Sequence, residues 1–111
     1  KRELRRGRVW RMSERALATP TLLIENERVR VTEWRFQADE ATGWHKHEYD
    51  YVIVPIMDGT LRLENPDGSV ESELTTGVPY FGEAGVEHDV INTSGCEMAF
   101  IETELKEPSL S

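Results

Sequence analysis

Short runs of alternating apolar and polar residues make up most of the chain from residue 21 onward. Most runs are rich in β-branched or aromatic residues, and turn residues follow at intervals of roughly eight to twelve positions. Two of these turns, Asp58-Gly59 and Asn65-Pro66-Asp67-Gly68, are typical of β-hairpins because Gly and Asn tolerate a positive φ. The predicted strands are Thr21–Ile24, Val29–Phe36, Tyr51–Met57, Thr60–Glu64, Val70–Leu74, Val90–Asn92 and Met98–Leu105.

This spacing predicts an all-β domain, either a sandwich or a barrel. The chain has 111 residues, which leaves room for one domain of ordinary size. We expect a basic N-terminal extension over 1–20, the β-barrel over 21–105 and a short C-terminal tail over 106–111. The stretch Ser13–Ala18 is the one part of the sequence compatible with a helix, which Pro20 would end.

Charge is divided unevenly along the chain, whose net charge is −8. Residues 1–15 hold seven basic and two acidic residues, whereas residues 16–111 hold six basic and nineteen acidic residues. The acidic body would repel a phosphate backbone, so we expect no nucleic-acid partner. The basic arm could touch nucleic acid or anionic lipid, but we favour two other interpretations. It is an extension upstream of a start at Met12, or it packs against an acidic neighbouring subunit.

The remaining composition indicates the compartment and the assembly. No stretch is apolar enough for a membrane helix, and the N-terminus is too charged for a signal peptide. The single cysteine, Cys96, cannot form an intrachain disulfide. We therefore expect a cytoplasmic protein with no membrane partner. A small barrel also exposes apolar strand edges, which predicts a homodimer.

The three histidines carry most of the functional information in the sequence. His45 and His47 are two residues apart, so on an extended strand their imidazoles project from the same face and two ligands could share one ion. Such a pair by itself more often belongs to packing or to the surface. His88 changes this interpretation, because it lies three residues after Gly85 at the start of a strand.

These positions resemble the two sequence motifs of the cupin superfamily. The second motif fits Gly77, Gly85, His88 and Asn92 in register, with Glu83 in the position of its proline. The first motif fits His45, His47 and, one residue late, Gly59, while its leading glycine would fall near Gln37. The glutamate of the first motif is replaced by Tyr51. The stretch 41–92 also resembles small bacterial cupins labelled as β-alanine-degradation proteins, a label that names no reaction.

The resemblance implies a single-domain cupin jelly-roll barrel with one divalent metal ion held by His45, His47 and His88. Neutral imidazoles suit Fe(II), which we favour, and also Zn, Ni, Mn and Cu. Without the glutamate, the ion keeps its full charge and more positions stay open for an anionic substrate. Some three-histidine members are iron dioxygenases that cleave β-diketones or oxidise thiols. A cupin that has lost its metal is the structural alternative.

Tyr51 is the candidate catalytic residue because it occupies the position of the missing ligand. It shares strand parity with His45, His47 and Tyr49, so both phenols face the interior if no bulge intervenes. Tyr51 could be plain core, donate a hydrogen bond to water or substrate at the metal, or ligate weakly as phenolate. Glu102 could support a metal ligand from behind or be solvated, and we favour the solvated position. Asn92 is expected to stabilise a turn or a strand end.

Two functional classes follow from these residues. We favour a mononuclear non-haem Fe(II) dioxygenase acting on a small β-dicarbonyl, keto-acid or thiol compound. The alternative is a non-catalytic cupin that binds a metal or a small ligand. The sequence lacks a Gly-rich phosphate loop, a Ser/His/Asp order and a close carboxylate pair, so kinase, hydrolase and glycosidase functions have no support.

Overall fold

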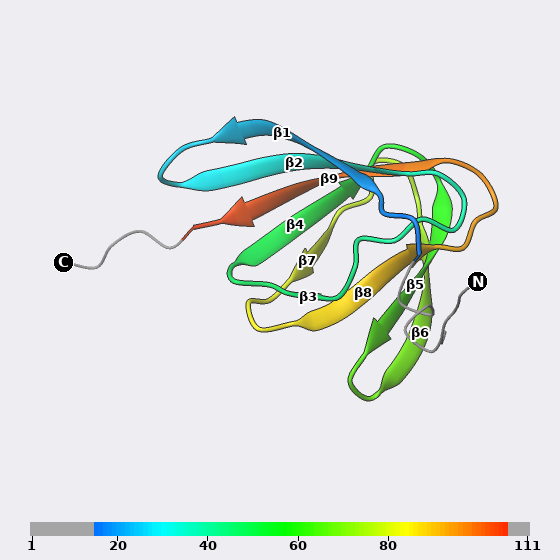
Figure 1. The fold of residues 1–111 in the computed structure, drawn as a ribbon. Coiled ribbons are helices and arrows are strands. Elements are labelled where there is room, and N and C mark those ends of the chain that lie inside the picture. Colours follow the sequence, from blue (N-terminus) through cyan, green and yellow to red (C-terminus); the bar gives the residue numbers. More distant parts are fainter. Residues whose placement is uncertain (1–14, 107–111) are drawn as a thin grey trace, which may run out of the picture.

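The computed structural model describes residues 15–106, which form nine β-strands and no helix (Figure 1). The strands are β1 (Thr19–Glu25), β2 (Val29–Phe36), β3 (His45–Lys46), β4 (Asp50–Pro55), β5 (Gly59–Asn65), β6 (Gly68–Leu74), β7 (Tyr80–Gly82), β8 (Glu87–Asn92) and β9 (Met98–Leu105). Accordingly, none of these residues belongs to a helix that could cross a membrane.

The strands form two antiparallel sheets. One has five strands in the order β1-β2-β9-β4-β7, and the other has four in the order β3-β8-β5-β6. Neighbours that are distant in sequence, such as β2 with β9 and β5 with β8, pair along most of their length. The all-β prediction is confirmed, and the sheet order is that of a jelly roll.

Seven strands were predicted to within a few residues, because period-two alternation and turn residues are local signals. The short strands β3 and β7 were not predicted. The helix proposed over Ser13–Ala18 is wrong for the part described, residues 15–18. There the chain is extended, since Ala18 donates its N–H to the carbonyl of Ala41 at 2.8 Å. The basic arm itself, including Met12, lies outside the described residues.

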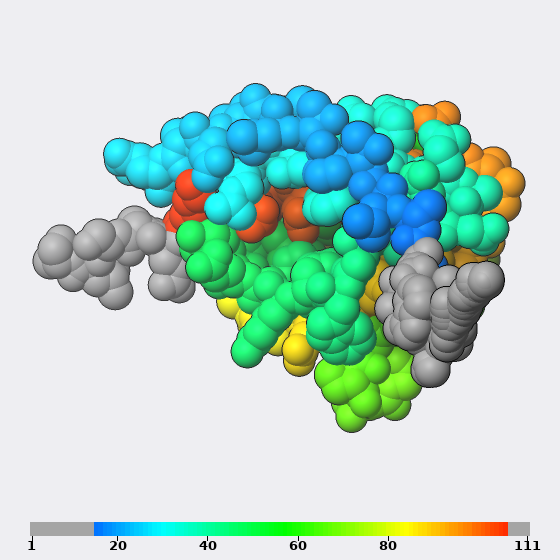
Figure 2. Space-filling model, in the orientation of Figure 1, coloured from blue at the N-terminus to red at the C-terminus, as the bar shows by residue number. Residues whose placement is uncertain are grey.

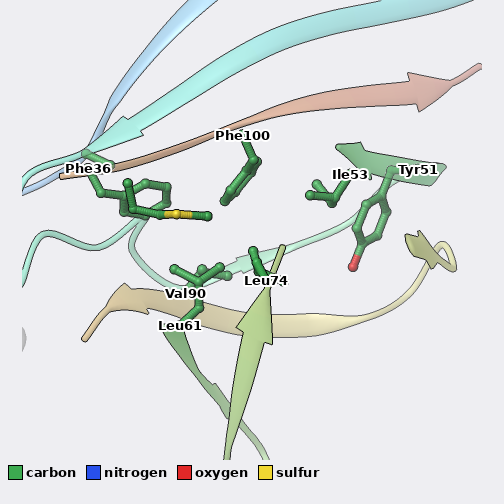
Figure 3. Close-up of a cluster of buried hydrophobic side chains, with 9 residues drawn as sticks. Phe36, Tyr51, Ile53, Leu61, Leu74, Val90 and Phe100 are labelled. Atoms are coloured by element: carbon green, nitrogen blue, oxygen red, sulfur yellow. The ribbon is translucent and has the colours of Figure 1, made fainter. Parts of the chain in front are cut away.

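The core lies between the two sheets. Phe36, Phe100 and Ile53 project from the five-stranded sheet toward Leu61 and Val90 of the other (Figure 3). Figure 3 also shows Tyr51 at the opposite end of this row from Phe36. The apolar packing therefore fills one end of the sandwich and leaves Tyr51 beside a more polar interior at the other end.

Candidate metal centre

The three histidines come together between the sheets. His45 on β3 and His88 on β8 are directly opposite each other in an antiparallel pair. His47 follows β3, where its N–H donates to Val86 and its carbonyl accepts from Gly85, both at 2.8 Å. Gly85 has a φ of 95°, which a side chain would disfavour, so the glycine of the second motif shapes the turn that holds His47.

The Nε2 atoms of the histidines converge. His47 Nε2 lies 3.1 Å from His45 Nε2 and 3.0 Å from His88 Nε2. Two nitrogens that share an ion at ~2.1 Å are ~3.0 Å apart at a right angle and ~3.4 Å apart at the tetrahedral angle. The observed separations fit adjacent positions of an octahedral ion. The ligating atoms of the three residues all lie within 4.8 Å of one another, so these residues could hold a metal ion.

The protonation of the histidines suits metal binding. Burial lowers the pKa of His47 to about 3, with smaller electrostatic effects from His45 and His88. Burial also lowers the pKa of His88 to about 4, with a smaller electrostatic effect from His45. Both rings are therefore neutral near pH 7. For His45, Nδ1 lies 2.9 Å from the carbonyl oxygen of Gly43, which can only accept, so Nδ1 is the donor and Nε2 is the atom available to a metal ion.

Tyr51 faces the interior but lies against a ligand ring. It is 4% exposed, and its ring stacks on the imidazole of His47 with centroids 3.8 Å apart and planes 18° apart. Burial, with a smaller effect from the charge of Glu102, raises the pKa of the Tyr51 phenol to about 12. The phenol therefore stays protonated and can donate a hydrogen bond. Its packing role is shown directly by the stacking on His47.

Tyr49 does not share this environment, because the chain bends over residues 48–49 before β4 begins. Its ring lies partly exposed, with the guanidinium of Arg30 5.9 Å from the ring centroid. The parity that was expected to link Tyr49 with Tyr51 assumed an uninterrupted strand. The bend removes that link, and of these two tyrosines it is Tyr51 that lies beside the histidines.

Glu102 does not have the solvated position that the sequence favoured, and it lies instead behind a proposed ligand, which was the other alternative. It is 7% exposed, and one carboxylate oxygen accepts a hydrogen bond from Trp34 Nε1 at 3.0 Å. The other oxygen lies 3.7 Å from His47 Nδ1. Burial raises the pKa of Glu102 to about 7, and this effect is larger than the lowering of the pKa by the hydrogen bond from Trp34. Its strand parity with Met98 and Phe100 was the signal in the sequence for an inward position.

A cavity of about 260 Å³ opens beside the histidines. Apolar side chains form part of its wall, and charged residues of both signs, including Arg30, Lys46 and Glu104, also line it. A volume at the small end of ligand pockets suits a compact molecule. The cavity is lined by Arg30, Trp34, Thr42, His45, Lys46, His47, Glu48, Tyr51, Ile53, Tyr80, His88, Val90, Phe100, Glu102 and Glu104.

Asn92 has the structural role that was expected of it. It is 0% exposed and its amide donates to the carbonyls of Gln37 at 3.1 Å and Cys96 at 2.7 Å. The backbone N–H of Ser94 donates to its side-chain oxygen at 3.0 Å. Asn92 therefore stabilises the end of β8 and lies outside the cavity wall.

Comparison with known proteins agrees with this arrangement. Residues 32–104 match the cupin domain family. The chain is 53% identical over 95 residues to the Beta-alanine degradation protein BauB of Pseudomonas aeruginosa, covering 86% of this chain and 100% of that protein. A crystal structure of a cupin domain from Bordetella pertussis Tohama I is 55% identical, with a TM-score of 0.82 over 85% of this chain and 98% of that one.

A more distant structure shares the fold alone. The polyketide cyclase RemF of Streptomyces resistomycificus is 24% identical, with a TM-score of 0.67 over 84% of this chain and 68% of that one. The matched family covers more than half of the chain, and it includes the three histidines and the strands that bring them together. This chain therefore belongs to the cupin family.

Proposed function

We propose that His45, His47 and His88 bind one divalent metal ion and that the Fe(II) form is a dioxygenase. Its substrate would be a small β-dicarbonyl, keto-acid or thiol compound. The convergence of the three Nε2 atoms is the observation that carries this proposal, with His47 Nε2 3.1 Å from His45 Nε2 and 3.0 Å from His88 Nε2. A bound Fe(II) would supply the redox chemistry with dioxygen.

The chain's own residues favour a compact anionic substrate. The three proposed ligands are imidazoles and not carboxylates, so the charge of the ion would be offset by an enolate or a thiolate. The apolar wall formed by Ile53, Val90 and Phe100 would exclude water from the bound molecule, while Tyr51 could donate a hydrogen bond to it. A compact molecule of this class agrees with a cavity of about 260 Å³.

Metal analysis tests the site. Protein purified from its own host should contain about one metal ion per chain, and His45→Ala, His47→Ala or His88→Ala should remove most of it. Metal bound to the native state alone stabilises it, so chelation should lower the melting temperature. Val90→Ala is the matched control, because Val90 is the next inward residue on β8 and has no ligating atom. Full metal retention in His88→Ala would contradict the site.

Oxygen uptake tests the reaction. The Fe(II)-loaded protein is assayed with β-diketones, β-keto acids and small thiols, and the Zn(II)-loaded protein is the control. Oxygen consumption by the iron form alone supports the dioxygenase. Stoichiometric metal without oxygen consumption across the panel would favour the alternative, a non-catalytic cupin that binds a metal or a small ligand.

Substitutions at Tyr51 test the substrate-binding part of the proposal. Tyr51→Glu adds a carboxylate beside the histidines, which should tighten metal binding and weaken the binding of an anionic substrate. Tyr51→Phe should keep the metal and reduce kcat if the phenol orients the substrate or dioxygen. Wild-type turnover in Tyr51→Phe would remove the catalytic role and leave Tyr51 as a packing residue.

A further inference from the structure

The carboxylate of Glu102 lies between two nitrogen atoms. Trp34 Nε1 is 3.0 Å from Oε1, and His47 Nδ1 is 3.7 Å from Oε2. The indole N–H can only donate, so it fixes Oε1 as an acceptor and sets the orientation of the whole carboxylate. The second oxygen is thereby directed at the imidazole of His47.

A histidine that binds a metal ion through Nε2 needs a hydrogen-bond acceptor at Nδ1. If Nε2 of His47 holds an ion, the proton of the neutral ring is on Nδ1, which becomes a donor. For His45 the carbonyl oxygen of Gly43 accepts that proton at 2.9 Å. For His47 the acceptor that faces Nδ1 is the carboxylate of Glu102, whose Oε2 is 3.7 Å away.

We propose that Glu102 is the positioning residue of His47, accepting a hydrogen bond from Nδ1 and so directing Nε2 toward His45 and His88. Trp34 holds the carboxylate in place for this role. The separation of 3.7 Å is longer than a hydrogen bond, which is ~3.2 Å at most. A small rotation of the carboxylate or of the imidazole would shorten it. The inference rests on the proposed metal site.

The consequence concerns charge as well as orientation. A carboxylate behind a ligating imidazole increases the basicity of that ligand. This chain has Tyr51 where the cupin motif has a glutamate ligand. Glu102 would place a negative charge behind His47, farther from the ion than a ligating glutamate would be. The ligand position that the glutamate occupies in the motif would then stay open for substrate.

Glu102→Gln is a sharp test because an amide has one acceptor atom and the site needs two. If the amide oxygen faces Trp34, the amide NH₂ faces Nδ1–H of His47, and two donors oppose each other. We expect Co(II) affinity, measured by competition with a chromophoric chelator, to fall about 10- to 100-fold. The visible absorption bands of the Co(II) protein should also shift, because the donor strength of His47 changes.

Glu104→Gln is the matched control. Glu104 is two residues along on the same face of β9, also lines the cavity, and pairs with Arg30 at 3.0 Å instead of with a histidine. The control removes the same charge from the same strand, and we expect Co(II) affinity and spectrum to stay near those of the wild type. An equal loss in both variants would overturn the proposal, because a general charge effect would then explain it.

Trp34→Phe combined with Glu102→Gln tests the competition between the two donors. Without the indole N–H, the amide oxygen is free to turn toward His47, so the double variant should regain part of the affinity lost in Glu102→Gln. Absence of any recovery would overturn the proposal. If Glu102→Gln does not fold, Trp34→Phe alone should still weaken Co(II) binding measurably, and an unchanged affinity would overturn the role of the anchored carboxylate.

His88→Ala separates this inference from the metal site on which it rests. Loss of Co(II) in His88→Ala, together with wild-type affinity in Glu102→Gln, would reject the role of Glu102 and keep the site. Retention of Co(II) in His88→Ala would reject the site itself.

Discussion

At the scale of single residues, the approach of Gly82 to Tyr51 determines where the stacked ring can lie. A Cβ atom at position 82 would overlap Cζ, Oη and Cε1 of Tyr51. These two residues are paired across β7 and β4, and the backbone of Gly82 does not have a positive φ. Glycine is therefore needed here for space and not for its backbone freedom.

Gly82→Ala should consequently destabilise the protein by about 1 to 3 kcal/mol, the usual cost of overpacking. It should also displace Tyr51 from His47 and weaken metal binding. Urea denaturation and Co(II) titration measure the two effects. In a Tyr51→Leu background the same alanine substitution should cost much less, because the ring is gone. An equal cost in both backgrounds would contradict the steric explanation.

Acidification should destabilise the metal-free protein. His47 and His88 have pKa values of about 3 and about 4 in the folded state, against 6.5 in the unfolded chain, so the unfolded state binds more protons as the pH falls below 6.5. Glu102 acts in the opposite direction, because its pKa is about 7 when folded and 4.5 when unfolded, and its contribution is lost as the pH rises through 7. On acidification, the loss of stability caused by the two histidines is larger than the gain from Glu102.

Urea midpoints of the metal-free protein at about pH 7 and about pH 5 measure this balance. The midpoint should be lower at the acidic value. His88→Gln should reduce the difference, since one buried imidazole no longer has to stay neutral. A midpoint that rises on acidification would mean that Glu102 dominates over both histidines.

At the scale of strands and turns, Asn92 connects the end of β8 to the segment after β2 and to the turn before β9. Its amide reaches Gln37 after β2 and Cys96 before β9, while Ser94 donates to its oxygen in the turn between β8 and β9. The amide group of Asn92 must donate as well as accept, and it is completely buried. The alignment of β8 with its neighbours therefore depends on one polar side chain.

Asn92→Asp should destabilise the protein by about 3 kcal/mol, since a carboxylate cannot donate to the buried carbonyls of Gln37 and Cys96. Asn65→Asp is the matched control. Asn65 accepts from the N–H of Asp67 at 2.9 Å in the β5–β6 turn, and a carboxylate accepts equally well. The free energy of unfolding of the Asn65→Asp variant should stay within about 0.5 kcal/mol of the wild-type value. Equal thermal stability of the two variants would contradict the donor role of Asn92.

At the scale of the whole molecule, the outer face of the five-stranded sheet is unusually apolar. Strand register aligns one row across it: Ile24, Val31, Thr103, Val52 and Phe81. Ile24 is 52% and Phe81 56% exposed, and every residue of β1 is exposed along the rim of the molecule (Figure 2). An antiparallel sheet with one face on the core normally has a polar outer face.

We expect a second copy to cover this face in a homodimer. Five strands at ~4.8 Å spacing and a strand length of ~20 Å give ~500 Å² per protomer, so the pair reaches the ~1,000 Å² of a specific interface. The charges near this face largely neutralise one another, since Arg35 pairs with Glu33 at 2.9 Å and with Glu97 at 2.8 Å. Two copies can therefore pack through this apolar, nearly neutral face without the electrostatic repulsion that two acidic surfaces would cause.

Light scattering should give the mass of a dimer at micromolar concentration, and Val52→Lys should give a monomer because it places a charge within the apolar row. Val78→Lys is the control, since Val78 is 57% exposed but lies in the segment before β7. Deletion of residues 1–11 should leave the dimer intact. A monomeric wild type would contradict the expected assembly, and a dimeric Val52→Lys would assign it to another surface.

The local pattern of the sequence determined the strands and the identity of the proposed ligands. Alternation and turn residues predicted β2, β5 and β9 because these signals act between neighbours in the chain. The spacing of His45 and His47, with the motif position of His88, indicated a three-histidine centre. The structure brings all three together as that resemblance implies.

Only the tertiary structure decided what surrounds the histidines. The contact of Trp34 with Glu102 joins residues 68 positions apart, and the contact of Glu102 with His47 joins β9 to the segment after β3. Residues 15–18 are extended because they bond to the backbone near Ala41, which overrides their local helix preference. Strand parity limits each side chain to one of two faces. Which face is buried, and which partners meet there, depends on how the two sheets pack.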